Sequence, residues 1–266
     1  MKPPGVRKVR RTNISFVALL AGVLLPGAAI PAVADNPFVA VAGAEFRSAL
    51  PARPQAPVTV QRFMLQQHAV TNAEYLEFLK THGEWRRDAV PVVMADADYL
   101  SHWSGTLDPG PHAAPLQPVT RVSWFAAVAY CEAQHARLPS WYEWEWAAAA
   151  SARQRDARAD AAWRQQVLDW YSQPAGGVLP AVQQGPANFH GLYDLHGVVW
   201  EWVEDFNALL PADADPEKFC GNGAQNLEQK ENYAVLMRIA MLGSLRASDT
   251  GRALGFRCAR DAAGSP

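Results

Sequence analysis

Cysteine is scarce in this chain of 266 residues, which contains three, at positions 131, 220 and 258. No two of them have the close spacing that zinc-binding cysteines share, and the seven histidines also lack the spacing of metal ligands. A nucleophile elbow and a phosphate-binding loop are both absent from the sequence. These absences argue against zinc-finger proteins, α/β-hydrolases and P-loop nucleotide-binding proteins.

Charge is also sparse. Charged residues make up 19% of the chain, and the formal net charge is −2 at pH 7. The lysines and arginines are scattered, so nothing in the sequence indicates a nucleic-acid partner. The sequence has no internal repeat, no low-complexity segment and no interdomain linker, which favours a single domain with a substantial core.

The N-terminus has the three parts of a secretory signal peptide. A segment with five lysines and arginines precedes an apolar run over residues 16–30, and Ala32-Val33-Ala34 follows as a small-residue cleavage signal. We therefore expect residues 1–34 to be removed, and residues 35–266 to form one exported domain in the periplasm or outside the cell. A membrane anchor is the alternative, but the run is short for a bilayer span and Pro26 interrupts it.

Tryptophan is abundant, at ten residues, and long aliphatic runs are few. Large rings that each cover much surface suit an irregular fold. Residues 40–46 and 58–65 have the alternation and the β-branched content of strands. Residues 82–120 and 204–230 are typical of loops, and residues 151–160 indicate a solvated helix end or a loop.

Capping residues mark the start of three helices. Thr71 and Ser140 are each followed three residues later by glutamate, which is the spacing of a capping box. Ser123 precedes a stripe of apolar residues at helical spacing. The first helix is expected over residues 72–81, and the other two directly after their serines.

Five short motifs in a fixed order resemble the signature of the formylglycine-generating enzyme family, also called the sulfatase-modifying factor family. Each motif alone is weak evidence, but together they extend over nearly all of the expected mature protein. The motifs are Val70-Thr71-Asn72 with Tyr75 and Phe78; residues 118–124; Arg137-Leu138-Pro139-Ser140 with Glu143-Trp144-Glu145; residues 191–203; and residues 254–258.

The resemblance implies an α+β fold of the modified C-type-lectin type. Such a fold has little regular secondary structure, short twisted antiparallel strands and a few packed helices. The superfamily includes pyoverdine-maturation and nitrite-reductase accessory proteins. The resemblance also implies a disulfide between Cys131 and Cys258, with two buried free thiols as the alternative; export favours the disulfide.

The family's reaction depends on copper. Members with formylglycine-generating activity bind copper(I) through two cysteines and use dioxygen to oxidise a substrate cysteine. When this sequence is anchored on Gly255-Phe256-Arg257 and on Arg238, the two thiolate positions fall near Gln229 and Ala234. Neither side chain offers the soft sulfur ligand that copper(I) prefers. We therefore expect the copper site of the family to be lost.

Other residues could supply a soft metal site. Cys220 lies in a glycine-rich turn, and Met237 and Met241 are four residues apart, so they would share one face of a helix. The simpler interpretation is that both methionines belong to the core and that Cys220 is a structural or incidental thiol.

Calcium is the second metal that the resemblance implies, in a structural role. Asp194 and Glu201 are the candidate carboxylate ligands. Val198 stands where the family often has an asparagine ligand, and valine offers no oxygen to a hard cation. Hydrogen bonding within the loop is the alternative role of the two carboxylates.

Three functions are compatible with these observations. The first is an exported oxidase or maturation factor with altered chemistry, acting on a peptide or small molecule. The second is a non-catalytic lectin-like binding or assembly module, and the third is a true sulfatase activator. Arg238, Arg257, Trp202 and Cys220 are the candidates for the cleft. Arg257 could instead pair with Asp194 or Glu201 in the interior, and Trp202 could be a core ring.

Overall fold

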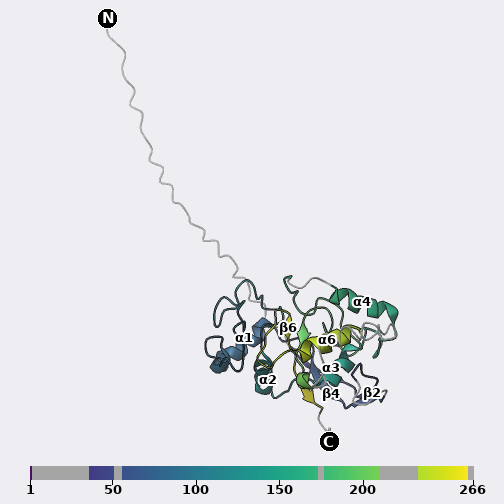
Figure 1. Cartoon of the computed structure of the whole chain (residues 1–266). Helices are drawn as coiled ribbons and strands as arrows, with labels where there is room; N and C mark the ends of the chain where they lie inside the picture. Colours follow the sequence, from purple (N-terminus) through teal and green to yellow (C-terminus); the bar gives the residue numbers. More distant parts are fainter. Residues whose placement is uncertain (2–35, 51–55, 173–176, 210–232, 263–266) are drawn as a thin grey trace. The chain divides into compact units, whose positions relative to one another are not determined.

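The computed structural model describes residues 1, 36–50, 56–172, 177–209 and 233–262 (Figure 1). The chain divides into a short unit, Met1–Ala32, and a large unit, Val33–Pro266, and only the second is described below. The predicted signal peptide, Cys220 and Gln229 lie outside the described residues.

Short antiparallel strands form two small sheets. β1 (Phe38–Val41) pairs with β4 (Phe63–Gln66), and β4 also pairs with β7 (Ala259–Asp261) near the C-terminus. β2 (Ala44–Phe46) pairs with β3 (Val58–Val60). The central strand β4 therefore joins the first and last parts of the large unit.

The two strands predicted over residues 40–46 and 58–65 are each divided in two, which the alternation of side chains did not show. The first division falls at Gly43, where an added Cβ atom would lie 2.6 Å from the carbonyl oxygen of Val60. The backbones approach each other too closely here for any side chain. Only glycine fits this position, and the pairing changes from one sheet to the other across it.

The three predicted helices are present and begin at their predicted caps. They are α1 (Asn72–Thr81), α2 (Trp124–Ala133) and α3 (Trp141–Ala148). The Thr71 hydroxyl accepts a hydrogen bond from the backbone N–H of Glu74, and the Glu74 carboxylate accepts one from the backbone N–H of Thr71, at 2.7 Å. α3 has the same complete capping box.

Two further helices follow in the chain. α4 (Ala161–Tyr171) was not predicted; it starts at Asp160, whose carboxylate accepts hydrogen bonds from two backbone N–H groups of the first turn. α6 (Tyr233–Gly243) covers the apolar run that contains Arg238. The two helices contact each other. Two short 3-10 helices are η1 (Gly83–Trp85) and η2 (Phe206–Ala208).

One strand pair brings the two C-terminal motifs together. β5 (Trp200–Glu201) and β6 (Leu254–Gly255) pair in parallel, whereas the family resemblance implied antiparallel strands. An added Cβ atom at Gly255 would lie 2.6 Å from the carbonyl oxygen of Val119. Glycine is therefore required in the last motif, because the backbone packs directly on that of the second motif.

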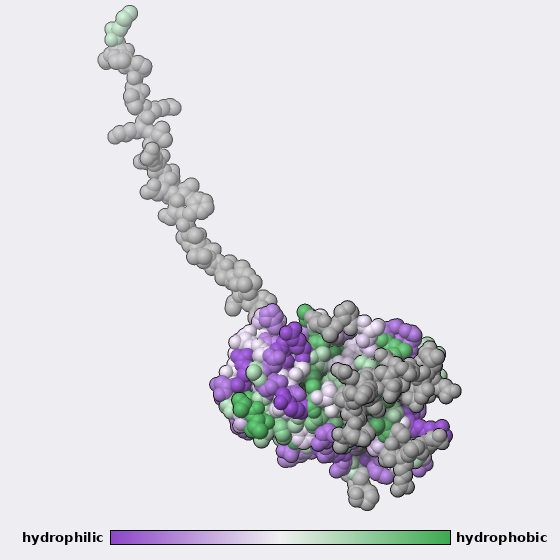
Figure 2. Space-filling view, in the orientation of Figure 1, coloured by the Kyte–Doolittle hydropathy of each residue, from purple (hydrophilic) through white to green (hydrophobic). Residues whose placement is uncertain are grey.

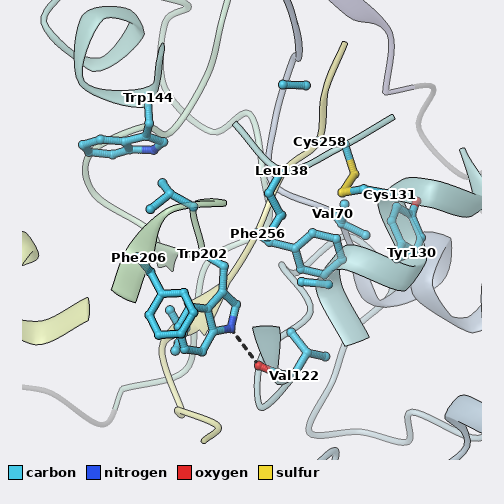
Figure 3. Packing of buried hydrophobic residues seen from close by; sticks show 14 of the residues in the cluster. Val70, Val122, Tyr130, Cys131, Leu138, Trp144, Trp202, Phe206, Phe256 and Cys258 are labelled. Carbon is cyan, nitrogen blue, oxygen red and sulfur yellow. Dashed lines mark hydrogen bonds between the residues drawn. A yellow bond between two sulfur atoms is a disulfide. The ribbon is translucent and has the colours of Figure 1, made fainter. Parts of the chain in front are cut away.

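Aromatic rings fill much of the core (Figure 3). Trp202 is fully buried, and its indole N–H donates to the carbonyl oxygen of Val122 at 3.0 Å. Next to the ring of Phe256, a disulfide joins Cys131 of α2 to Cys258, which precedes β7. Both sulfur-bearing residues are completely buried. The disulfide is the one that the resemblance implied.

The surface turned to the viewer in Figure 2 mixes hydrophilic and hydrophobic residues. Within the described residues, the helices are too short or too polar to cross a membrane.

The disulfide generates the first prediction. The double variant Cys131→Ala/Cys258→Ala should lose roughly 4 kcal/mol of unfolding free energy, because the bond constrains a long loop of the unfolded chain. Urea unfolding of the two proteins under oxidising conditions measures the difference. A reductant should lower the stability of the wild type and leave that of the variant unchanged. Equal stability of both proteins without reductant would contradict the prediction.

Candidate functional site

A buried ion pair lies at the centre of the C-terminal motifs. Glu201 and Arg257 are both fully buried, and Arg257 Nη2 donates to Glu201 Oε1 at 2.8 Å while its Nε donates to Oε2 at 3.0 Å. The indole N–H of Trp144 also donates to Oε2, at 2.8 Å. Main-chain carbonyl oxygens of Tyr193 and Gln66 accept the remaining Arg257 donors, at 2.8 and 3.2 Å.

These contacts assign a structural role to Arg257, because each of its nitrogen atoms has a partner inside the protein. Of the two interior partners that the sequence left open, the structure has Glu201. Asp194 lies apart from this pair: its Oδ2 accepts the backbone N–H of Gln183 at 2.7 Å, and burial raises its pKa. The carboxylate of Glu201 is occupied by Arg257 and Trp144, so it does not fit a calcium ion.

Arg238 is the second buried arginine of the cluster. Its Nη2 donates to the main-chain oxygen of Glu201 at 2.8 Å, and its guanidinium carbon lies 3.6 Å from the ring centre of Trp144. Within the described residues, its Nε and Nη1 have no partner at full hydrogen-bond geometry. The hydroxyl of Tyr171 lies beside the guanidinium, and the two side chains stabilise each other's charged forms. Burial lowers the pKa of Arg238, and Tyr171 opposes this shift.

His196 lies against the same aromatic group. Its ring meets those of Trp144 and Trp163 edge-on, with 5.7 Å between centroids in each pair. Nε2 lies 3.0 Å from the carbonyl oxygen of Ala148, whereas the buried Nδ1 has no partner. Burial lowers the pKa of His196 to about 4, and the charge of Arg238 contributes to the shift. The imidazole is therefore neutral at pH 7.

His196 also lines an open recess of about 480 Å³. Trp163 and Trp170 of α4 contribute rings to it, and the loop that carries Asn188 and Asp194 faces them. The recess is wide enough for a small ligand. Sequence analysis missed it, because α4 was not predicted. The signal was present: Asp160 is a good N-cap, and apolar residues at positions 163, 167 and 170 have helical spacing.

The other predicted site residues lie elsewhere or outside the described residues. Trp202 is a core ring that packs against Phe206, with 5.0 Å between centroids. Met237 and Met241 are half-buried on α6. Cys220 belongs to the part of the chain that is not described. Within the described residues, no three His, Cys, Asp or Glu side chains are grouped as a metal site.

Comparison with known proteins decides the family. A model described as the sulfatase-modifying factor enzyme 1-like domain matches residues 7–262. The chain belongs to the sulfatase-modifying factor family. The match includes most of the predicted signal peptide, whose cleavage stays a prediction.

Relatives in this family differ in activity. The formylglycine-generating enzyme of Streptomyces coelicolor is 30% identical over 279 residues, which cover 83% of this chain and 86% of that protein. The inactive C-alpha-formylglycine-generating enzyme 2 of Mus musculus is 29% identical over 260 residues, covering 79% of this chain and 78% of that protein. Overall identity therefore does not separate an active member from an inactive one.

A solved structure also shares the fold. The crystal structure of CarF has a TM-score of 0.50 and 15% sequence identity, over 86% of this chain and 99% of that chain. Together with the family match, this likeness supports the α+β fold of the sulfatase-modifying factor family.

The described residues do not fit the copper centre of the family. Ala234, at one of the two expected thiolate positions, is a buried residue of α6 with a methyl side chain. It lies one helical turn before Arg238 and, with His196, lines a small cavity beside the recess. Gln229, at the other position, offers an amide instead of a thiolate.

The ion pair generates the second prediction. Glu201→Gln should lower the unfolding free energy by about 3–5 kcal/mol, because it leaves the buried charge of Arg257 uncompensated. Urea unfolding measures the loss. Asp261→Asn is the matched control, since Asp261 pairs with Arg137 at the surface and its side chain is 75% exposed; it should change stability by no more than about 1 kcal/mol. A loss in Glu201→Gln as small as in the control would be contrary to expectation.

The third prediction concerns pH. Because the pKa of His196 is lowered from 6.5 to about 4, the folded state resists its protonation. Its contribution to stability is complete above pH 6.5 and decreases as the pH falls towards 4, by up to about 3 kcal/mol. Urea unfolding between pH 7 and pH 4 should therefore show a smaller loss in His196→Gln than in the wild type. His102, whose pKa is also lowered to about 4, contributes equally to both proteins. Parallel curves would contradict this assignment.

Proposed function

We propose that this protein is an exported oxidase or maturation factor that acts on a peptide or small molecule without the paired thiolates of its family. One observation carries the proposal. The family framework is retained around Glu201 and Arg257, while Ala234 stands near one of the expected thiolate positions and lines a small cavity beside the recess. The residues that hold the fold together are retained, whereas the expected thiolate ligands are replaced. This combination favours altered chemistry on a similar scaffold.

Export is supported by two independent features. The N-terminal residues have the pattern of a signal peptide, and the protein contains a fully buried disulfide between Cys131 and Cys258. Disulfides of this kind are typical of oxidising compartments. Both features together support our proposal of a periplasmic or extracellular location.

A non-catalytic binding or assembly module is the second candidate. The absence of both thiolates from the expected positions favours it. The recess beside His196 could bind a ligand without changing it. The lectin-like fold by itself does not distinguish the two candidates.

Oxygen uptake distinguishes the two candidates. The purified mature protein, offered thiol and phenol donors with and without added copper or iron, should consume oxygen faster than a heat-denatured sample. If no donor and no metal supports uptake, the oxidase proposal fails and the binding module is favoured. A peptide with the sequence Cys-x-Pro-x-Arg should keep its mass in the same reactions. Its conversion to the formylglycine product would instead identify a sulfatase activator.

A genetic test complements this assay. Cys220→Ser and Arg238→Lys are introduced separately into a deletion strain, and complementation is scored beside the level of folded protein. An oxidase that uses either residue should lose function in that variant at normal protein levels. A binding module should tolerate both variants and should lose function when residues of the recess, such as Trp170, are replaced.

A further inference from the structure

A second cavity lies beside the first turn of α1, and the described residues that line it are all different from those of the recess. Its volume is about 220 Å³. Its wall comes from three segments that are far apart in the sequence: Asn72 of α1, residues 102–120 and residues 177–179. Sites for drug-sized ligands occupy roughly 300–1,000 Å³, so this cavity suits a smaller molecule.

Hydrogen bonds join the three segments of the wall. Asn72 Nδ2 donates to the main-chain oxygen of Gln117 at 3.2 Å, and its Oδ1 accepts from the indole N–H of Trp103 at 3.2 Å. Gln117 Nε2 donates to the main-chain oxygen of Leu179 at 2.6 Å. The cavity is therefore formed without a ligand, which lowers the cost of ordering its wall on binding.

The wall has polar and apolar side chains but no acidic ones among its described residues. The polar part consists of histidine, threonine and amide side chains: His102, His112, Thr120, Asn72 and Gln117. The apolar part consists of Pro111, Pro118, Val178 and Leu179. Val178 is 91% exposed, so its side chain is available to a ligand. Such a wall suits a molecule with an apolar body and a negative group, because no carboxylate in it repels an anion.

Arg87 places positive charge behind His102. Its Nη1 donates to the main-chain oxygens of Leu100 and Trp103, at 3.1 and 2.9 Å, which belong to the segment that carries His102. These oxygens satisfy the donor but carry no net charge. They therefore leave the positive charge of the guanidinium in place.

Arg121 adds a second positive charge. Its Nη1 lies 3.4 Å from Oδ1 of Asp98, whose side chain is 71% exposed, so water screens this ion pair. Burial, followed by the charges of Arg121, Arg87 and His112, lowers the pKa of His102 to about 4. All three charges that act on His102 thus have the same sign. An anion in the cavity would offset their repulsion and would favour the protonated imidazole.

We propose that this cavity binds a small organic anion, a carboxylate attached to an apolar body. The carboxylate lies on the side of His102 and His112, where the charges of Arg87 and Arg121 stabilise it. The apolar body lies against the prolines and Leu179. Nδ1 of His102 is enclosed by the protein, so the attraction acts through charge and requires no contact with that atom. The site is separate from the recess, and this inference goes beyond the proposed function.

Two matched probes test the inference by isothermal titration calorimetry on the mature protein. Benzoate has the apolar ring and the carboxylate, whereas benzamide has nearly the same shape without the charge. The wild type should bind benzoate roughly tenfold more tightly, because only the anion gains from the positive charges. Equal affinities, or no binding of benzoate at millimolar concentration, would overturn the inference without the use of any variant.

Benzoate binding should also be linked to proton uptake. Because the bound anion favours the protonated form of His102, the affinity should increase roughly tenfold from pH 7 to pH 5, a range in which benzoate stays largely ionised. Titrations in two buffers with different ionisation enthalpies measure the number of protons taken up. An affinity that stays constant or falls over this range, with no proton uptake, would contradict the inference.

Variants then locate the site. His102→Gln keeps a polar side chain that cannot take up a proton, so the dependence of benzoate affinity on pH should be smaller than in the wild type. His112→Gln should weaken benzoate and leave benzamide unchanged. His135→Gln is the matched control, because His135 is exposed and lies outside the lining of the cavity. A pH dependence as large in His102→Gln as in the control would refute the assignment.

Discussion

The ion pair between Glu201 and Arg257 is the constraint on which the rest of this structure depends. A carboxylate and a guanidinium without solvent exposure are tolerated only because every donor and acceptor has a partner. Those partners come from distant parts of the chain: Trp144 from α3, Tyr193 from the loop before β5, and Gln66 from β4. The pair therefore fixes how three of the family motifs meet, through Trp144, Glu201 and Arg257.

Arg238 extends this cluster. Within the described residues, the oxygens of Glu201 bond to Arg257 and Trp144, while Arg238 contacts the main-chain oxygen of Glu201, the face of Trp144 and the side chain of Tyr171. Burial lowers the pKa of His196 to about 4, and the positive charge of Arg238 contributes to this shift. Because His196 also lines the recess, the packing of the core sets the protonation state of one residue in the wall of the recess.

The sequence identified the capped helices correctly, because capping depends on neighbouring residues such as Thr71 and Glu74. The disulfide was implied only by the family resemblance. What depends on contacts between distant segments was not predictable: the division of the first strand at Gly43, and the choice of Glu201 over Asp194 as the partner of Arg257. α4 is a different case. Its N-cap residue and the helical spacing of its apolar residues could be recognised in the sequence, but the charged residues before it suggested a loop.

Retention of the scaffold and retention of the reaction are separate matters in this family. The disulfide and the ion pair stabilise the fold through contacts that do not involve Ala234. A chain can therefore replace a thiolate with a methyl group at that position and lose none of these interactions. Since neither interaction involves Ala234, both are compatible with a member that has altered chemistry and with a member that has none. Only residues that contact a ligand can reveal which kind of member this is.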